Sequence, residues 1–226
     1  MTISTARADI LRLSAEMTNL PNLLTLSRIA VIPVLVGLFY VEGEAARWAA
    51  CGLFTAAGIT DYFDGYFARS RAQVSAFGRF LDPIADKLLV AAVILMLVAF
   101  DRIAGLVVLP ALIILCREIL VSGLREFLAG LNVGLPVSRL SKLKTLLQLV
   151  ALGFLIVGDA GPAAMPVTLT GEVGLWVAAL LTLVTGYDYL VTGLRHMAED
   201  APDDRRRAER PSPAAASRAE PVGPAG

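Results

Sequence analysis

Six long apolar segments run through this chain, and they constrain its fold more than any other feature. They lie at about 22–41, 45–64, 82–100, 103–125, 143–160 and 172–194. Crossing the hydrocarbon core of a bilayer takes roughly 20 apolar residues in a helix, and only helices or closed barrels satisfy the backbone there. Hydrophobic residues make up 56% of the 226 residues, which is above the share in soluble domains. The sequence therefore predicts an all-α integral membrane protein with six transmembrane helices.

The basic residues are distributed unevenly between the two ends of these helices. In or next to the connections after the first and third segments, the only basic residues are Arg47 and Arg102, and the connection after the fifth holds none. The opposite ends carry Arg7, Arg12, Arg69, Arg71, Arg79, Arg125, Arg139, Lys142, Lys144 and Arg195. Because basic residues concentrate on the cytoplasmic side of membrane proteins, we expect a multi-pass protein of the inner (cytoplasmic) membrane with both termini in the cytoplasm.

The chain divides into a predicted membrane-embedded domain, 1–198, and a predicted tail, 199–226. The tail consists mainly of Ala, Pro, Arg, Glu, Ser and Gly, a composition that buries too little apolar surface to offset the entropy of ordering. We expect it to be disordered and cytoplasmic. The formal net charge of the whole chain is zero, so the overall charge gives no indication of nucleic-acid binding. Cys51 and Cys116 lie in apolar segments, which argues against a disulfide and for small buried side chains.

Four aspartates lie at the cytoplasmic ends of the second and third segments, within GITDYFDGYFARSRAQVSAFGRFLDPIADK at 58–87. Asp61 and Asp64 are three residues apart, and Asp82 and Asp86 are four apart, so each pair occupies one face of a helix. Four converging carboxylates need a cation beside them. Mg²⁺ and Mn²⁺ take oxygen ligands and commonly bind through carboxylates together with substrate phosphates. The pattern predicts a divalent-metal site that acts on a phosphate compound at the cytoplasmic face.

Small and basic residues accompany these aspartates. Gly65, Ala68 and Gly78 leave room for a phosphate or nucleotide close to the backbone, and Arg69 offers a fork of donors suited to phosphate oxygens. Each position alone also has an ordinary structural explanation, because acids lie at membrane interfaces, glycines pack helices together and arginines set topology. The combination of all eight positions in one pattern favours a functional site.

The stretch DxxDGxxARx₈GxxxDxxxD at 61–86 resembles the signature of the CDP-alcohol phosphatidyltransferase family, with every defining position present. The resemblance implies a six-helix membrane fold, usually a homodimer, with one or two divalent metals and the cytidine diphosphate at the cytoplasmic face. By resemblance, the site residues are the metal ligands Asp61, Asp64 and Asp82, the nucleotide and diphosphate contacts Asp61, Gly65, Ala68, Arg69 and Gly78, and Asp86 as catalytic base and further metal ligand. The base would deprotonate an acceptor hydroxyl, which attacks the β-phosphorus of CDP-diacylglycerol and releases CMP.

Three further stretches resemble the bacterial phosphatidylglycerophosphate synthase branch of this family, whose acceptor is glycerol 3-phosphate. They are NLPNLLTLSRIAVIP at 19–33, CREILVSGLREFLA at 116–129 and PVSRLSKLKTLLQ at 136–148. One departure is Ser141, where many relatives carry glycine. The resemblance implies synthesis of phosphatidylglycerophosphate, the precursor of phosphatidylglycerol in phospholipid biosynthesis.

A cluster of basic residues supports an acceptor that is itself anionic. The candidates for binding its phosphate are Arg117, Arg125, Arg139, Lys142 and Lys144, although basic residues on this side also follow from topology alone. Glu118 and Glu126 lie at helical spacing from basic residues and can pair with them. Two alternatives keep the chemistry and change the acceptor: cardiolipin synthase and phosphatidylinositol phosphate synthase. A remoter one is an ion or proton transporter, which explains the carboxylates but not their gathering at one face.

Overall fold

Every regular element in the described part of the chain is helical. The computed structural model describes residues 20–71, 76–130 and 139–208. The long helices are α2 (Leu20–Phe39), α3 (Glu44–Arg71), α4 (Ala76–Ala99), α5 (Val108–Gly130), α6 (Arg139–Val157) and α7 (Val167–Ala208), with short 3₁₀ turns η1 (Gly105–Val107) and η2 (Gly158–Ala160). Each long helix contains or largely overlaps one predicted segment, so the all-α prediction is confirmed.

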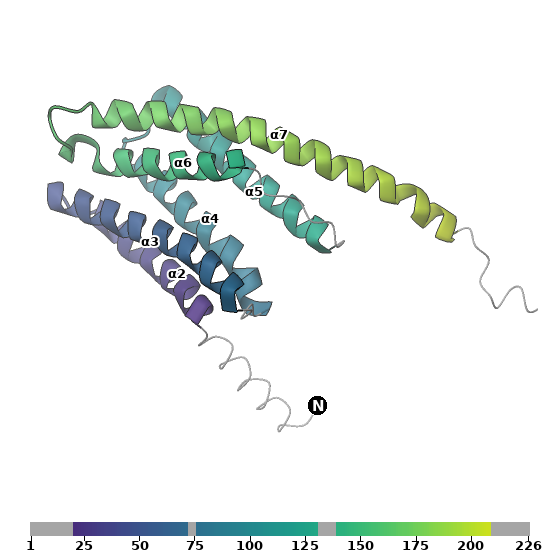
Figure 1. Cartoon of the computed structure of the whole chain (residues 1–226). Helices are drawn as coiled ribbons and strands as arrows, with labels where there is room; N and C mark the ends of the chain where they lie inside the picture. Colours follow the sequence, from purple (N-terminus) through teal and green to yellow (C-terminus); the bar gives the residue numbers. More distant parts are fainter. Residues whose placement is uncertain (1–19, 72–75, 131–138, 209–226) are drawn as a thin grey trace, which may run out of the picture.

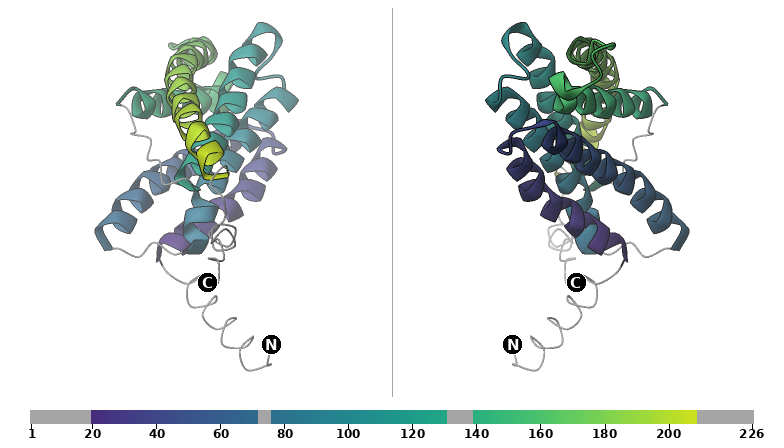
Figure 2. Two further views of the ribbon diagram at one scale, coloured as in Figure 1. Left: turned by 90° about the vertical axis from the view of Figure 1, so that its right-hand side faces the viewer. Right: turned by 90° about the vertical axis from the view of Figure 1, so that its left-hand side faces the viewer.

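Successive helices run in opposite directions, so the chain crosses the bundle from end to end (Figure 1). The α2–α3, α4–α5 and α6–α7 connections lie at one end of the bundle, called here the far end. The α3–α4 and α5–α6 connections lie at the other, called here the site end. α6 packs along α7 and against α3, and α2 packs against α3 and α4 (Figure 2). This arrangement brings the predicted functional segments of α3, α4, α5 and α6 to the site end.

Four of the described helices are long and apolar enough to cross a membrane: Asn22–Phe39, Gly105–Gly130, Leu140–Ala160 and Val167–Gly193. α3 and α4 have the required length, but charged residues interrupt their apolar runs. α3 carries Arg47 and Asp61, and α4 carries Asp82, Asp86 and Lys87. By length and composition, the described chain is therefore that of a multi-pass membrane protein with four candidate spans.

α4 ends in a well-defined cap. Asp101 has a φ of 55°, a left-handed conformation that non-glycine residues adopt uncommonly and that often closes a helix. The amide of Arg102 donates to the carbonyl of Leu97 at 2.8 Å, and the amide of Asp101 donates to that of Val98 at 3.1 Å. These are the two hydrogen bonds of a Schellman motif. They let α4 and α5 be separate helices although little chain joins them.

Contacts at the far end tie its three connections together. The Arg102 guanidinium donates to the Ile156 carbonyl at 2.8 Å and lies 5.0 Å from the centre of the Phe39 ring. The Trp48 indole donates to the Ala160 carbonyl at 3.1 Å. Residues from α2, α3, the α4–α5 connection and the end of α6 therefore meet at this end.

Arg47 and Arg102, the two basic residues predicted at this end, both lie there. Arg47 Nη1 is 3.9 Å from a carboxylate oxygen of Asp159. Burial lowers the pKa of the Arg102 guanidinium and nearby Arg47 lowers it further, while Asp159 raises it. Since arginine keeps its proton at physiological pH, the cluster carries two cations and one carboxylate.

Small residues let α7 approach α6 closely. A methyl group on Gly171 would lie 2.7 Å from Leu155 Cγ and 3.2 Å from the carbonyl oxygen of Ala151. A methyl group on Gly174 would lie 3.0 Å from Ala151 Cβ. Such close approach is a usual device of helix packing in membranes.

Two details differ from expectation. α7 continues as a helix to Ala208, beyond the predicted end of the membrane domain at 198, and residues 209–226 of the predicted tail lie outside the described residues. Cys51 is partly exposed and Cys116 exposed, and both are free thiols. The expectation of buried cysteines was therefore wrong for Cys116, whereas Cys51 is partly buried against the core, with its thiol donating to the Gly153 carbonyl of α6 at 3.6 Å.

Candidate active site

A cavity of about 1510 Å³ runs along the bundle from the site end towards the far end. Its lining comes from every long helix, α2 to α7. At the site end the lining is polar and charged, and includes Asp86, Lys87, Arg117, Glu118, Arg125, Glu126, Ser141, Lys142 and Lys144. Further along, between α3 and α6, the lining is mainly apolar and includes Phe54, Ile59, Leu146, Leu149, Val150, Phe154 and Val157. The cavity thus has a charged chamber and an apolar arm.

Four of the five predicted acceptor-binding residues line this chamber together with Asp86. They are Arg117 and Arg125 from α5, and Lys142 and Lys144 from α6. The fifth, Arg139, begins α6, and its side chain lies outside the described residues. α5 and α6 are separate in sequence, so it is the fold that brings their basic residues to one cavity.

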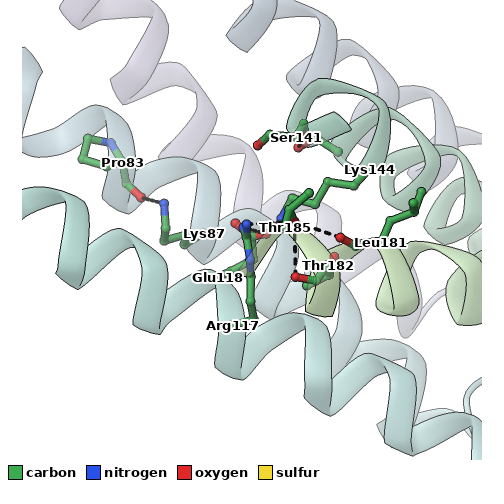
Figure 3. A network of polar contacts seen from close by, with 10 residues as sticks. Pro83, Lys87, Arg117, Glu118, Ser141, Lys144, Leu181, Thr182 and Thr185 are labelled. Carbon is green, nitrogen blue, oxygen red and sulfur yellow. Dashed lines mark hydrogen bonds and ion pairs between the residues drawn. The ribbon is translucent and has the colours of Figure 1, made fainter. Parts of the chain in front are cut away.

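A polar network forms the chamber wall between α5, α6 and α7 (Figure 3). One carboxylate oxygen of Glu118, Oε1, accepts hydrogen bonds from Lys144 Nζ and from Arg117 Nη1, the latter at 3.3 Å. Arg117 Nη2 also donates to Thr185 Oγ1 at 3.1 Å. The Lys144 side chain is only 2% exposed. Because an unpaired charge is costly to bury, this lysine depends on its carboxylate partner.

Asp86 joins this network electrostatically. It is half-buried on α4, lines the chamber, and is close enough to Lys144 for the two charges to interact. The neighbouring Lys87 donates from Nζ to the Pro83 carbonyl at 3.1 Å, within α4 (Figure 3). The predicted base and a predicted acceptor-binding lysine therefore belong to one chamber.

The remaining signature positions are placed by their backbone only. For the last turns of α3 the structure describes the backbone and not the side chains. This part of the helix holds Asp61, Asp64, Gly65, Ala68 and Arg69. The same holds for Asp82 in α4.

The backbone nevertheless relates these positions to the cavity. Asp61 follows shortly after Ile59, and Asp82 directly precedes Pro83, and both Ile59 and Pro83 line it. Gly78 is buried in the first turns of α4.

A metal centre stays a prediction. Among the side chains that the structure describes, no group of three or more His, Cys, Asp or Glu residues is close enough to hold a metal ion. Three of the four predicted ligands, Asp61, Asp64 and Asp82, are outside that set. The predicted ligands are all carboxylates, and this hard oxygen donor set suits Mg²⁺ or Mn²⁺.

Three residues of the wall were not predicted as site residues. Glu118 was expected only to pair with basic neighbours, which it does, but its position between two chamber cations was not foreseen. Thr185 contacts Arg117 from 68 positions away in the sequence. The Arg117 guanidinium lies 5.7 Å from the ring centre of Tyr189. No local spacing relates α7 to α5, so sequence patterns carried no signal for these two contacts.

Comparisons with known proteins agree with the motif. The family model described as CDP-alcohol phosphatidyltransferase matches residues 18–184. A Rickettsia typhi protein named CDP-diacylglycerol–glycerol-3-phosphate 3-phosphatidyltransferase is 53% identical over 173 residues, covering 76% of this chain and 96% of the relative. Proteins with the same name from Escherichia coli and Bacillus subtilis are 41% and 39% identical, each covering 76% of this chain and 93% and 94% of the relatives.

The matched region spans α2 to α6 and the first part of α7, and it includes the acidic motif and the basic residues that line the chamber. These similarities extend over most of each relative's length, well beyond the signature itself. The chain therefore belongs to the CDP-alcohol phosphatidyltransferase family.

Proposed function

We propose that this protein transfers a phosphatidyl group from CDP-diacylglycerol to glycerol 3-phosphate, giving phosphatidylglycerophosphate and CMP. The observation that carries the proposal is one cavity in which Asp86 and four of the predicted acceptor-binding residues share a charged chamber that continues into an apolar arm. The names of the most similar relatives describe the same reaction.

The shape of the cavity suits an amphiphilic donor. CDP-diacylglycerol has a charged head and two hydrocarbon chains. The charged chamber lies at the site end, beside the acidic motif, while the apolar arm runs between α3 and α6. Apolar chains gain free energy from apolar surroundings, and a diphosphate needs cations and donors. We therefore place the donor's head in the chamber and hydrocarbon in the arm.

The acidic motif fits a divalent metal through the chemistry of its donors. Asp61, Asp64, Asp82 and Asp86 would hold one or two Mg²⁺ or Mn²⁺ ions, and Gly65, Ala68, Arg69 and Gly78 would contact the nucleotide and diphosphate. When bound, the metal supplies positive charge that stabilises the diphosphate and the departing CMP. The fit rests on four carboxylates at the adjoining ends of α3 and α4.

The reaction needs a base and a means of orienting the acceptor. Asp86 removes the proton from the acceptor hydroxyl, whose oxygen then bonds to the β-phosphorus while the bond to the CMP oxygen breaks. Arg117, Arg125, Lys142 and Lys144 bind the acceptor's own phosphate through charge-assisted hydrogen bonds. Holding that phosphate fixes where the hydroxyl lies, which is the main benefit of binding a small substrate rigidly.

The proposed function also requires a particular arrangement of the helices in the membrane. We infer that all six long helices cross the inner membrane, with the site end and both termini in the cytoplasm, and that the protein is a homodimer with a membrane domain at 1–198 and a tail at 199–226. Placing the site end in the cytoplasm is supported by the basic residues gathered there, and it gives water-soluble glycerol 3-phosphate access to the chamber.

The test is CMP release from CDP-diacylglycerol by purified protein in detergent with Mg²⁺ or Mn²⁺. Glycerol 3-phosphate, phosphatidylglycerol and inositol phosphate are supplied separately. We expect release with glycerol 3-phosphate only. Release with phosphatidylglycerol would make the protein a cardiolipin synthase, and release with inositol phosphate a phosphatidylinositol phosphate synthase. No release with any of these acceptors, from folded protein, would refute the proposed chemistry.

A further inference from the structure

We propose that Glu118 is a positioning residue for the acceptor: its carboxylate bridges Lys144 and Arg117 and fixes the spacing at which these two cations receive the acceptor's phosphate. The inference rests on the proposed function. Because Glu118 is itself negatively charged, charge alone would not suggest it as part of a site that binds a phosphate.

The bridge joins two helices through a single atom. Glu118 Oε1 accepts from Lys144 Nζ on α6 and from Arg117 Nη1, on its own helix α5, at 3.3 Å. The three side chains are 20%, 2% and 10% exposed for Glu118, Lys144 and Arg117. Buried charge-assisted hydrogen bonds are among the stronger polar interactions in proteins. Glu118 therefore limits the movement of both cations in the chamber wall.

Arg117 is also held from the side of α7. Its Nη2 donates to Thr185 Oγ1, and its guanidinium lies 5.7 Å from the Tyr189 ring centre. Thr185 Oγ1 in turn donates to the Leu181 carbonyl at 2.8 Å, which orients the hydroxyl as an acceptor for Arg117 (Figure 3). A methyl group on Gly186 would lie 3.1 Å from Arg117 Cγ. The guanidinium is thus confined between α5 and α7.

The wall retains unused capacity for an anion. The buried Arg117 Nε has no hydrogen-bond partner among the described residues, and buried donors are rarely left unsatisfied. The remaining protons of Lys144 Nζ are also donors beyond the one that Glu118 accepts. A phosphate entering the chamber would accept hydrogen bonds from the remaining Lys144 donors.

Without the carboxylate, Lys144 and Arg117 would repel each other and lose their fixed spacing. Misplacement of a substrate by about 1 Å can cost around 10²-fold in rate. Glu118→Gln keeps the size of the side chain but presents an amide in place of the shared anion. The variant therefore tests the bridge rather than the packing around it.

The experiment measures CMP release while glycerol 3-phosphate is varied at saturating CDP-diacylglycerol, and then the reverse. For Glu118→Gln we expect the KM for glycerol 3-phosphate to rise about tenfold or more, and the KM for CDP-diacylglycerol to stay within about threefold. Glu118→Asp, which keeps the charge, should recover part of the loss. Glu172→Gln removes a carboxylate near the start of α7, at the far end, and should leave both values unchanged.

A double-variant comparison separates positioning from general structural support. If Glu118 acts through Lys144, Glu118→Gln should raise the KM for glycerol 3-phosphate by a smaller factor in a Lys144→Met background than in the unmodified protein. Equal factors in both backgrounds would overturn the proposal. So would an equal rise in both KM values, or a lowered thermal midpoint with unchanged kinetics.

Two further comparisons distinguish a variant that fails to fold, and a failure of the proposed function, from a failure of the proposal about Glu118. If Glu118→Gln does not fold, Glu118→Asp is tested in its place. Its shorter side chain displaces the carboxylate and should still raise the KM for glycerol 3-phosphate about threefold. No rise in this KM would overturn the proposal. If the unmodified protein shows no CMP release that depends on glycerol 3-phosphate, the proposed function fails. Normal kinetics in both Glu118 variants would refute only the role of Glu118.

Discussion

Lys142 and Lys144 are close in sequence and chemically identical, yet the structure predicts very different consequences of losing them. Lys144 is almost fully buried in the chamber wall and is bonded to Glu118. Lys142 also lines the cavity, but it is exposed. We predict that Lys144→Met impairs use of glycerol 3-phosphate far more than Lys142→Met does.

The expected sizes follow from burial. A buried hydrogen bond to a charged group contributes about 1.5–3 kcal/mol, and each 1.4 kcal/mol is a factor of about ten. Lys144→Met should therefore lower kcat/KM for glycerol 3-phosphate by about 10- to 150-fold. Exposed ion pairs contribute about 0.2–1 kcal/mol because water screens them, so Lys142→Met should cost at most about fivefold.

The assay is steady-state CMP release with each variant, with glycerol 3-phosphate and CDP-diacylglycerol varied in turn. The loss in Lys144→Met should fall on the acceptor and leave the KM for CDP-diacylglycerol within about threefold. Arg102→Met, at the far end, is the control for loss of a partly buried cation outside the chamber, and it should not change the KM for glycerol 3-phosphate. The reasoning is refuted if Lys142→Met costs more than Lys144→Met, or if the loss in Lys144→Met falls on the donor.

Three further predictions concern the base, the metal and the packing of α7. Asp86→Asn should lower kcat by about 10²–10⁴-fold, the usual contribution of a general base; a loss below tenfold in the CMP-release assay would argue against that role. Chelation by EDTA should abolish CMP release and added Mg²⁺ or Mn²⁺ should restore it; full activity after chelation would exclude the metal. Gly171→Ala should destabilise the protein by about 1–3 kcal/mol through overpacking, since its methyl would meet Leu155 Cγ at 2.7 Å. Gly52→Ala is the control, since its new methyl meets open space, and it should be neutral or stabilising. The measurement is the thermal midpoint of each variant in one detergent. Equal midpoints for the two variants would contradict the packing described for α7.

Local sequence patterns predicted most of the fold, because hydrophobic length is a local property. The six apolar segments correspond to α2 through α7. Helix ends were less predictable. α3 and α4 extend past their apolar parts into the charged motif, where amphipathic and polar residues continue a helix that hydropathy alone would end.

The chamber was predicted in its components and not in its geometry. Charge and motif indicated Asp86, Arg117, Arg125, Lys142 and Lys144, and all five line one cavity. Their differences in burial were not predictable, because they depend on how α5, α6 and α7 pack together. Sequence reasoning ranked Lys142 and Lys144 alike, whereas one is exposed and the other is held inside the wall.

The contacts that orient the wall depend on tertiary structure in the same way. Thr185 approaches Arg117 only because α7 packs against α5 and because Gly186 leaves room for the arginine side chain. A threonine and a glycine in an apolar helix have no distinctive pattern by themselves. Residues of this kind become visible only once the helices are placed.

The central claim is that the hydroxyl of glycerol 3-phosphate displaces CMP from the donor, and label transfer tests it most directly. Purified protein is incubated with CDP-diacylglycerol, a divalent metal and glycerol 3-phosphate that carries ¹⁸O in the hydroxyl at carbon 1. The masses of the products are then measured by mass spectrometry. The account predicts one CMP without label for each phosphatidylglycerophosphate formed, with the ¹⁸O retained in the lipid. Label in CMP, or phosphatidic acid and CMP as the products, would contradict it.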